Sequence, residues 1–147
     1  MFTRTEIKIF DRLPPEAEYI RTEVFINEQG FREEFDDKDD KSVHMVLFHD
    51  GRAAAVCRYY RQDGDYVLGR IAVLKEYRGR HFGAFLVSSA EAEIKRLGGT
   101  RIVIHAQLRA EKFYIKLGYS DSGMRDLDED CPHVWLYKEL TDMPVRP

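Results

Sequence analysis

One stretch of the chain, residues 68–84, carries the residue types and spacing that most clearly indicate chemistry. It reads Leu-Gly-Arg-Ile-Ala-Val-Leu-Lys-Glu-Tyr-Arg-Gly-Arg-His-Phe-Gly-Ala, a strand pattern that passes through a tight turn into a helix. The first turn of a helix has unpaired N–H groups and a partial positive charge, so it favours an anion such as a pyrophosphate. The glycines let backbone approach that anion, and the arginines fit phosphate oxygens. We therefore predict a phosphate-binding turn over residues 78–84, although a plain strand-to-helix turn with solvated arginines has the same pattern.

This turn differs from two common nucleotide-binding motifs. A P-loop requires Gly, four residues, then Gly-Lys-Ser/Thr, and a dinucleotide fingerprint requires Gly-x-Gly-x-x-Gly. Neither pattern occurs at this turn. The spacing of the glycines alone therefore does not identify the ligand.

The elements that must position this turn follow from periodicity and turn residues. Strand patterns cover residues 5–11, 43–49, 53–60, 66–73, 101–105, 119–124 and 134–138. Helical patterns cover residues 15–30, 82–97 and 110–117, and residues 31–41 and 126–132 are predicted loops. Asp50-Gly51 indicates a hairpin, whereas a helix between two strands implies a parallel crossover. We expect a single domain, residues 1–147, of the α/β (α+β) class: a mixed, mostly antiparallel twisted sheet of about seven strands with helices on both faces, in the order β-α-(α)-β-β-β-α-β-α-β-β.

Composition limits the classes of partner. The formal net charge of −3 gives no bulk electrostatic support for nucleic-acid binding. No stretch approaches the roughly 20 apolar residues of a membrane span, and the N-terminus lacks the form of a signal peptide. Cys57 and Cys131 match no metal or redox spacing, and His49 and His105 have no partners at zinc spacing. We expect a cytoplasmic protein with free thiols, no metal and no membrane or nucleic-acid partner.

The segment resembles the acetyl-CoA motif of the GNAT superfamily of N-acetyltransferases. That motif reads Gln/Arg-x-x-Gly-x-Gly/Ala, after a strand of the form R-x-x-V-x-x-x-x-R-G. The matching residues here are Arg70, Val73, Arg78, Gly79, Gly83 and Ala84. His81 stands where the motif usually has its central glycine, and whether its side chain contacts the pyrophosphate is open.

The resemblance implies acetyl-CoA as cosubstrate and a set of cofactor-binding residues. The backbone of strand 71–73, commonly splayed by a bulge, is expected to pair with the pantetheine arm. One of its N–H groups, near Ala72 and Val73, is expected to polarise the thioester carbonyl as an oxyanion donor. The expected cofactor-binding residues are Ile71, Ala72, Val73, Arg78, Gly79, Arg80, His81, Phe82, Gly83, Ala84 and Gln107.

A second motif lies at residues 107–119. It looks like the GNAT segment Asn-x-x-Ala-x-x-Phe-Tyr-x-x-Leu-Gly-Phe/Tyr, with Gln107 in place of the usual Asn. The resemblance implies that Tyr114 lies beside the CoA sulfur as general acid. A phenol with a pKa near 10 can protonate a departing thiolate at neutral pH. The alternative is a core tyrosine whose hydroxyl bonds to backbone.

A narrower resemblance is to the ElaA/YjcF-like branch of GNAT enzymes. Residues 21–29 match its R-x-E-V-F-x-x-E-Q helix, and Pro132-His133 matches its P-H pair before the last strand. His44 also fits this branch. Segments at these places border the acceptor cleft in the superfamily, so Glu28, His44 and His133 are candidates to assist deprotonation of an amine. The alternatives are a helix-end ion pair for Glu28, a strand-surface position for His44 and a backbone-bonded turn for His133.

Together these features predict an acetyl-CoA-dependent N-acetyltransferase that acts on a primary amine of a small molecule in a ternary complex. No covalent acyl-enzyme is expected, because neither cysteine lies in a matched motif beside a base. The alternative is a non-catalytic acyl-CoA sensor. A homodimer is possible. The acidic run in residues 33–40 is expected to be a solvated loop, or else to attract a cationic acceptor.

Overall fold

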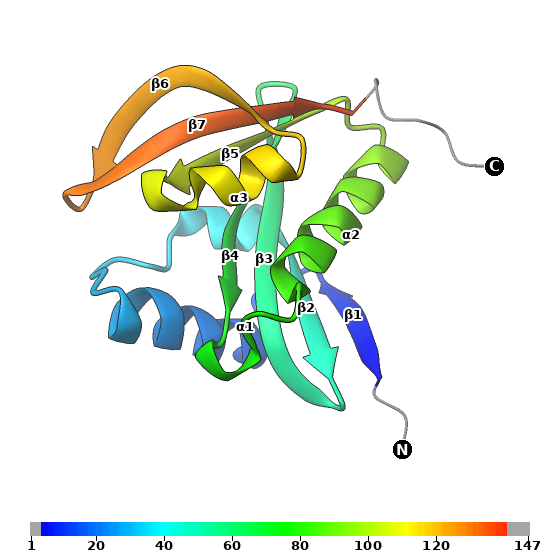
Figure 1. The fold of residues 1–147 in the computed structure, drawn as a ribbon. Helices are drawn as coiled ribbons and strands as arrows, with labels where there is room; N and C mark the ends of the chain where they lie inside the picture. The colour runs from blue at the N-terminus through cyan, green and yellow to red at the C-terminus, as the bar shows by residue number, and fades with distance from the viewer. Residues whose placement is uncertain (1–3, 141–147) are drawn as a thin grey trace.

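Within residues 4–140, seven strands form one sheet in the order β1-β2-β3-β4-β5-β7-β6 (Figure 1). The computed structural model describes residues 4–140. The strands are β1 (Thr5–Phe10), β2 (Val43–His49), β3 (Arg52–Gln62), β4 (Asp65–Val73), β5 (Arg101–Gln107), β6 (Ser120–Asp128) and β7 (Cys131–Glu139). Only β4 and β5 pair in parallel; the other neighbours are antiparallel. The predicted mixed, mostly antiparallel sheet is confirmed.

Helices cover both faces of the sheet. They are α1 (Pro15–Arg21), which continues as the π-helix η1 (Thr22–Glu28), then η2 (Asp37–Lys41), η3 (Lys75–Tyr77), α2 (Phe82–Arg96), η4 (Leu108–Ala110) and α3 (Glu111–Lys116). Strand β2 is buried on both faces: Met45 and Leu47 join the core beneath α2, while Val46 and Phe48 join the core beneath α1. The period-two alternation of a strand produces these two cores. Among residues 4–140, no helix has the length and apolar character needed to cross a bilayer.

Strands β4 and β5 diverge after a short region of pairing. Tyr66 pairs with Ile102 and Val67 with Val103, and the register extends no further. Strand β4 also carries an extra residue opposite β3, where Arg70 has φ +50°. A bulge of this kind bends a strand away from its neighbour. The sheet therefore opens between β4 and β5, whose arrows point in different directions in Figure 1.

The predicted loop at residues 126–132 is wrong. Strands β6 and β7 extend into it and leave Glu129 and Asp130 as a tight hairpin turn, with φ +48° and +66°. Positive φ at both central residues characterises the turn that matches strand twist. Strand β6 lies at the sheet edge with nearly every residue exposed, so it has no apolar alternation to reveal it.

The expectation of a solvated acidic loop is also wrong for two of its carboxylates. Glu34 and Asp39 are only 4% and 5% exposed. Arg21 donates to Glu34 at 2.8 Å and to Asp39 at 2.7 Å, and Arg58 donates to Asp39 at 2.8 Å. Buried charges require such partners, so the acidic run serves to neutralise two buried arginines.

Candidate active site

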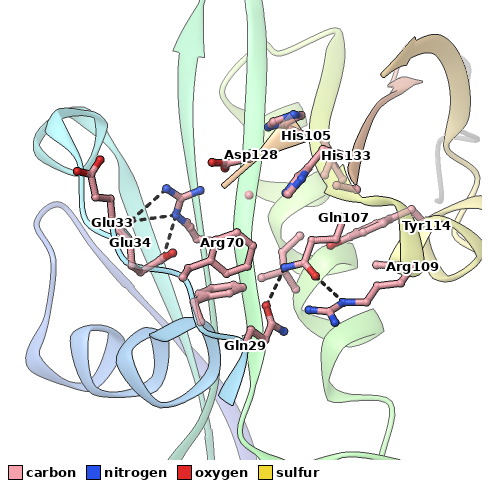
Figure 2. Close-up of a pocket in the computed structure, with 17 residues that line it drawn as sticks. Gln29, Glu33, Glu34, Arg70, His105, Gln107, Arg109, Tyr114, Asp128 and His133 are labelled. Atoms are coloured by element: carbon pink, nitrogen blue, oxygen red, sulfur yellow. Dashed lines mark hydrogen bonds and ion pairs between the residues drawn. The ribbon is translucent and has the colours of Figure 1, made fainter. Parts of the chain in front are cut away.

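Two cavities meet at the opening between β4 and β5. The first, here called the α2 cavity, lies between β4, the N-terminus of α2 and α3. The second, here called the histidine cavity, lies between η1, β4 and β5 and includes His105 and His133 (Figure 2). Gln29, Ile71, Ala110 and Tyr114 line both cavities. A ligand that fills the α2 cavity can therefore meet another one from the opposite side beside Tyr114.

The turn that opens α2 presents free amide groups to the α2 cavity. Within the described chain, no N–H group of residues 79–84 donates a hydrogen bond to the protein. Gly79 has φ +81° and His81 has φ +62°, so both lie in the left-handed region. His81 therefore adopts the conformation that glycine takes most easily, which explains why the related motif has glycine there.

Gly83 allows close packing at the same turn. A Cβ on Gly83 would lie 3.3 Å from Phe113 Cζ and 3.7 Å from Val73 Cγ2. The first distance is tighter than ordinary van der Waals contact. The absence of a side chain therefore lets α2 approach α3 and β4, which form the other walls of the cavity.

Arg78 is paired with Glu28 at the edge of the α2 cavity. Its Nη1 and Nη2 donate to the Glu28 carboxylate at 2.6 and 2.7 Å, and its Nε donates to the Val73 carbonyl at 3.0 Å. The hydrogen bonds from Arg78 lower the pKa of Glu28. A carboxylate held in this way is a weak base, and an anion in the cavity would compete with it for Arg78.

Tyr114 lies at the junction of the two cavities. Its side chain is buried, yet its hydroxyl makes no hydrogen bond with any residue in the described range 4–140. Burial raises the pKa of the phenol. The hydroxyl thus stays protonated and is free to donate to a ligand.

Alternating positions on adjacent strands build the polar wall of the histidine cavity. His105 on β5 lies between the rings of His133 and Trp135 on β7, with ring centroids 4.5 Å from each. His133 Nδ1 is 2.8 Å from the Cys131 carbonyl, and His105 Nε2 is 2.6 Å from Asp126 on β6. Because a carbonyl only accepts, His133 Nδ1 carries the proton, and its Nε2 has a lone pair when the ring is neutral.

Hydrogen bonds join the side chains of Gln29, Gln107 and Arg109 along the lower edge of the histidine cavity in Figure 2. Gln107 donates to Gln29 at 2.7 Å and accepts from Arg109 at 2.6 Å. The π-helix η1 ends immediately before Gln29 and directs this side chain to β5. Such π-helical turns often occur at functional sites.

The predicted site residues fall into three groups. The α2 cavity is lined by Ile71, Ala72, Val73, Arg78, Gly79, His81, Phe82, Gly83, Ala84 and Tyr114. The histidine cavity includes His133 and Gln107, so Gln107 lies on the side opposite the turn. Arg80, Glu28 and His44 line neither cavity. Arg80 lies over the Tyr77 ring, and His44 is buried with Nε2 3.0 Å from the Asp39 carbonyl. Burial lowers the pKa of His44.

Sequence reasoning missed His105, Asp128 and Gln29 as cavity residues. His105 and Asp128 come from different strands, and the sequence pattern predicts a loop at Asp128. Gln29 belongs to the helix segment that matches the ElaA/YjcF-like branch, but its residue type by itself indicates no role. His105 and Asp128 lie on the same face of the sheet, and this shared face is the signal that could link them. It can be recognised only when the pairing of the strands is known.

Comparisons with known proteins identify the family. Residues 13–140 match the model of the acetyltransferase (GNAT) domain. The chain is 32% identical to the uncharacterized N-acetyltransferase YjcF of Bacillus subtilis strain 168 over 127 residues, 84% of this chain and 91% of that protein. A Lactobacillus plantarum crystal structure superposes with a TM-score of 0.83 and 30% identity, over 92% of this chain and 98% of the other. Escherichia coli ElaA, at 22% identity, shares the fold with a TM-score of 0.80 over 92% of this chain and all of ElaA.

The chain therefore belongs to the GNAT acetyltransferase family, and it resembles the ElaA/YjcF-like branch.

Proposed function

We propose that this protein transfers an acetyl group from acetyl-CoA to a primary amine of a small molecule by direct attack in a ternary complex. The α2 cavity holds the CoA diphosphate on the turn at residues 78–84 and the pantetheine arm along β4. The histidine cavity holds the acceptor. A cytoplasmic location and a possible homodimer remain part of this proposal.

The free amides of the phosphate-binding turn support the cofactor assignment. Unbonded N–H groups at the start of a helix of 15 residues suit a diphosphate, because the helix dipole adds to their positive charge. Arg78 supplies a guanidinium once the diphosphate displaces Glu28. An amide near Ala72 and Val73 then stabilises the negative charge that develops on the thioester oxygen.

Proton transfers accompany the reaction on both sides of the reacting carbon. The amine nitrogen forms a bond to the acetyl carbon, while the bond from that carbon to sulfur breaks. His133 Nε2 accepts the proton that the amine loses, and Tyr114 donates its proton to the sulfur. Of the three candidates for the base, only His133 lines the acceptor side, whereas Glu28 and His44 line neither cavity.

The observation that carries this proposal is the place of Tyr114. The side chain of Tyr114 is buried, and its hydroxyl, which has no partner in the described part of the chain, lies where the two cavities meet. A CoA sensor would need neither this hydroxyl nor the second cavity. An acetyltransferase uses the hydroxyl as proton donor and the second cavity as the binding site of the acceptor.

Calorimetry with acetyl-CoA, followed by a thiol-release assay over a panel of primary amines, tests the proposal. We expect one acetyl-CoA per chain and thiol release that depends on at least one amine. Binding without release for any amine would favour the sensor. Failure to bind acetyl-CoA would overturn both readings.

A further inference from the structure

Three side chains on one wall of the histidine cavity can each offer a metal ligand. One ligand atom from each of His105, Asp128 and His133 lies within 4.8 Å of the other two. The three residues belong to β5, β6 and β7, and the strand register places them on the same face of the sheet. Figure 2 shows both rings beside Asp128 at the edge of the cavity.

One nitrogen of each imidazole in this cluster contacts a protein oxygen, and the other nitrogen makes no such contact within residues 4–140. Asp126 binds His105 at Nε2, and the Cys131 carbonyl binds His133 at Nδ1. Histidines that ligate metals usually donate their other N–H to a carboxylate or a carbonyl, which fixes the tautomer and makes the ligating nitrogen more basic. The side chain of Asp128 makes no hydrogen bond within the described residues, so its carboxylate is available.

We propose that His105, Asp128 and His133 bind one divalent transition-metal ion, with Zn²⁺ as the best match. Two imidazoles and one carboxylate suit Zn²⁺, whereas Ca²⁺ and Mg²⁺ prefer oxygen ligands throughout. Three protein ligands leave at least one coordination position open, and that position faces the histidine cavity. The spacing along the chain gave no metal signal because the ligands come from three strands.

The site has a consequence that rests on the proposed function. The lone pair on His133 Nε2 cannot bind a metal and accept a proton at the same time. Bound Zn²⁺ therefore blocks amine acetylation, while acetyl-CoA in the α2 cavity binds as before. The ion acts as a reversible inhibitor that competes with the acceptor.

Metal binding is tested without any activity measurement. Protein without a histidine tag is titrated with Zn²⁺ by calorimetry. A second titration uses Co²⁺, because its visible absorption spectrum distinguishes cobalt of low coordination number from the hydrated ion. We expect one ion per chain, with affinity reduced at least tenfold by His133→Ala, His105→Ala or Asp128→Asn. Asp126→Ala is expected to reduce affinity about 10- to 100-fold through the tautomer of His105.

One control and one mild ligand substitution keep this test decisive. His49→Ala removes a histidine outside the cluster and should leave Zn²⁺ affinity unchanged. Asp128 is partly exposed and its side chain makes no hydrogen bond in the described structure, so Asp128→Asn tests the site without threatening the fold. Zn²⁺ affinity that is equal in wild type and Asp128→Asn, or cobalt spectra of the hydrated ion only, would overturn the site.

The inhibition is tested in the thiol-release assay. Zn²⁺ should lower amine-dependent release in the wild type, with full recovery on adding a chelator and no change in the acetyl-CoA Kd. Asp128→Asn should need at least tenfold more Zn²⁺ for the same fractional inhibition. If no amine is acetylated, the proposed function fails, but the cobalt spectrum still decides the metal site. Zn²⁺ bound at the cluster without inhibition would overturn the shared role of His133.

Discussion

At the scale of the residue, Tyr114 and His133 illustrate how a hydrogen bond, or its absence, decides whether a side chain can donate or accept a proton. The hydroxyl of Tyr114 has no partner among residues 4–140, and burial raises the pKa of the phenol. His133 is the reverse case, since the Cys131 carbonyl fixes one nitrogen and leaves the other as acceptor. One group can give a proton and the other can take one, on opposite sides of the opening between β4 and β5.

Replacing Tyr114 by phenylalanine tests the acid role. Tyr114→Phe should lower kcat at least tenfold and change the acetyl-CoA Kd by less than about twofold, because only the proton donor is lost. Steady-state kinetics and calorimetry measure the two quantities. Tyr19→Phe, on an exposed part of α1, is the matched control. Equal turnover in Tyr114→Phe and wild type would rule out the acid role.

Replacing His133 tests the base role. His133→Gln should lower kcat/KM at least tenfold, because the glutamine amide has no basic nitrogen that can accept the amine proton. Steady-state kinetics of the variant and the wild type measure this. Equal kcat/KM in His133→Gln and wild type would assign the base to another group.

At the scale of the element, the N-terminus of α2 depends on its close approach to α3 and β4. Gly83 is the contact point, because a Cβ there would come 3.3 Å from the Phe113 ring. His81 and Gly79 take left-handed conformations that turn the chain sharply before the helix. The turn thereby exposes amides to the α2 cavity instead of using them within the protein.

A bulky residue at the contact point should disturb the turn but not the sheet. Gly83→Val is expected to raise the acetyl-CoA Kd at least tenfold, because its methyl groups push α2 from α3 and β4. Ser88→Val places the same side chain on the exposed face of α2 and serves as control. Calorimetry and circular dichroism separate lost binding from unfolding. Equal affinity in Gly83→Val and the control would show that the close approach is not required.

At the scale of the whole molecule, buried ion pairs join segments that are distant in sequence. Asp39 from η2 binds Arg21 from the end of α1 and Arg58 from β3. Burial opposes ionisation of Asp39, but the hydrogen bonds and charges of the two arginines outweigh it and lower the pKa from 3.8 to about 2. These contacts hold residues 31–41 against the sheet, next to the histidine cavity.

The lowered pKa predicts acid sensitivity. The stabilisation by Asp39 is complete above its unfolded pKa and is lost as the pH falls through about 4 to 2, which amounts to about 2 kcal/mol. Between pH 5 and pH 2, wild type should lose about 2 kcal/mol more unfolding free energy than Asp39→Asn. Urea unfolding at both pH values measures this, with the exposed Asp40→Asn as control. Equal losses in wild type and Asp39→Asn would contradict the prediction.

The sequence by itself determined the order of strands and helices along the chain, the mixed, mostly antiparallel sheet and the family, because these depend on local periodicity and on short motifs. Tyr114 could be named from its motif, but its unbonded hydroxyl could not. The histidine cluster, the buried Asp39 and the full length of β6 required the tertiary structure. Each depends on which strands become neighbours, and neither an exposed edge strand nor a charged segment carries a local pattern that reveals its partner.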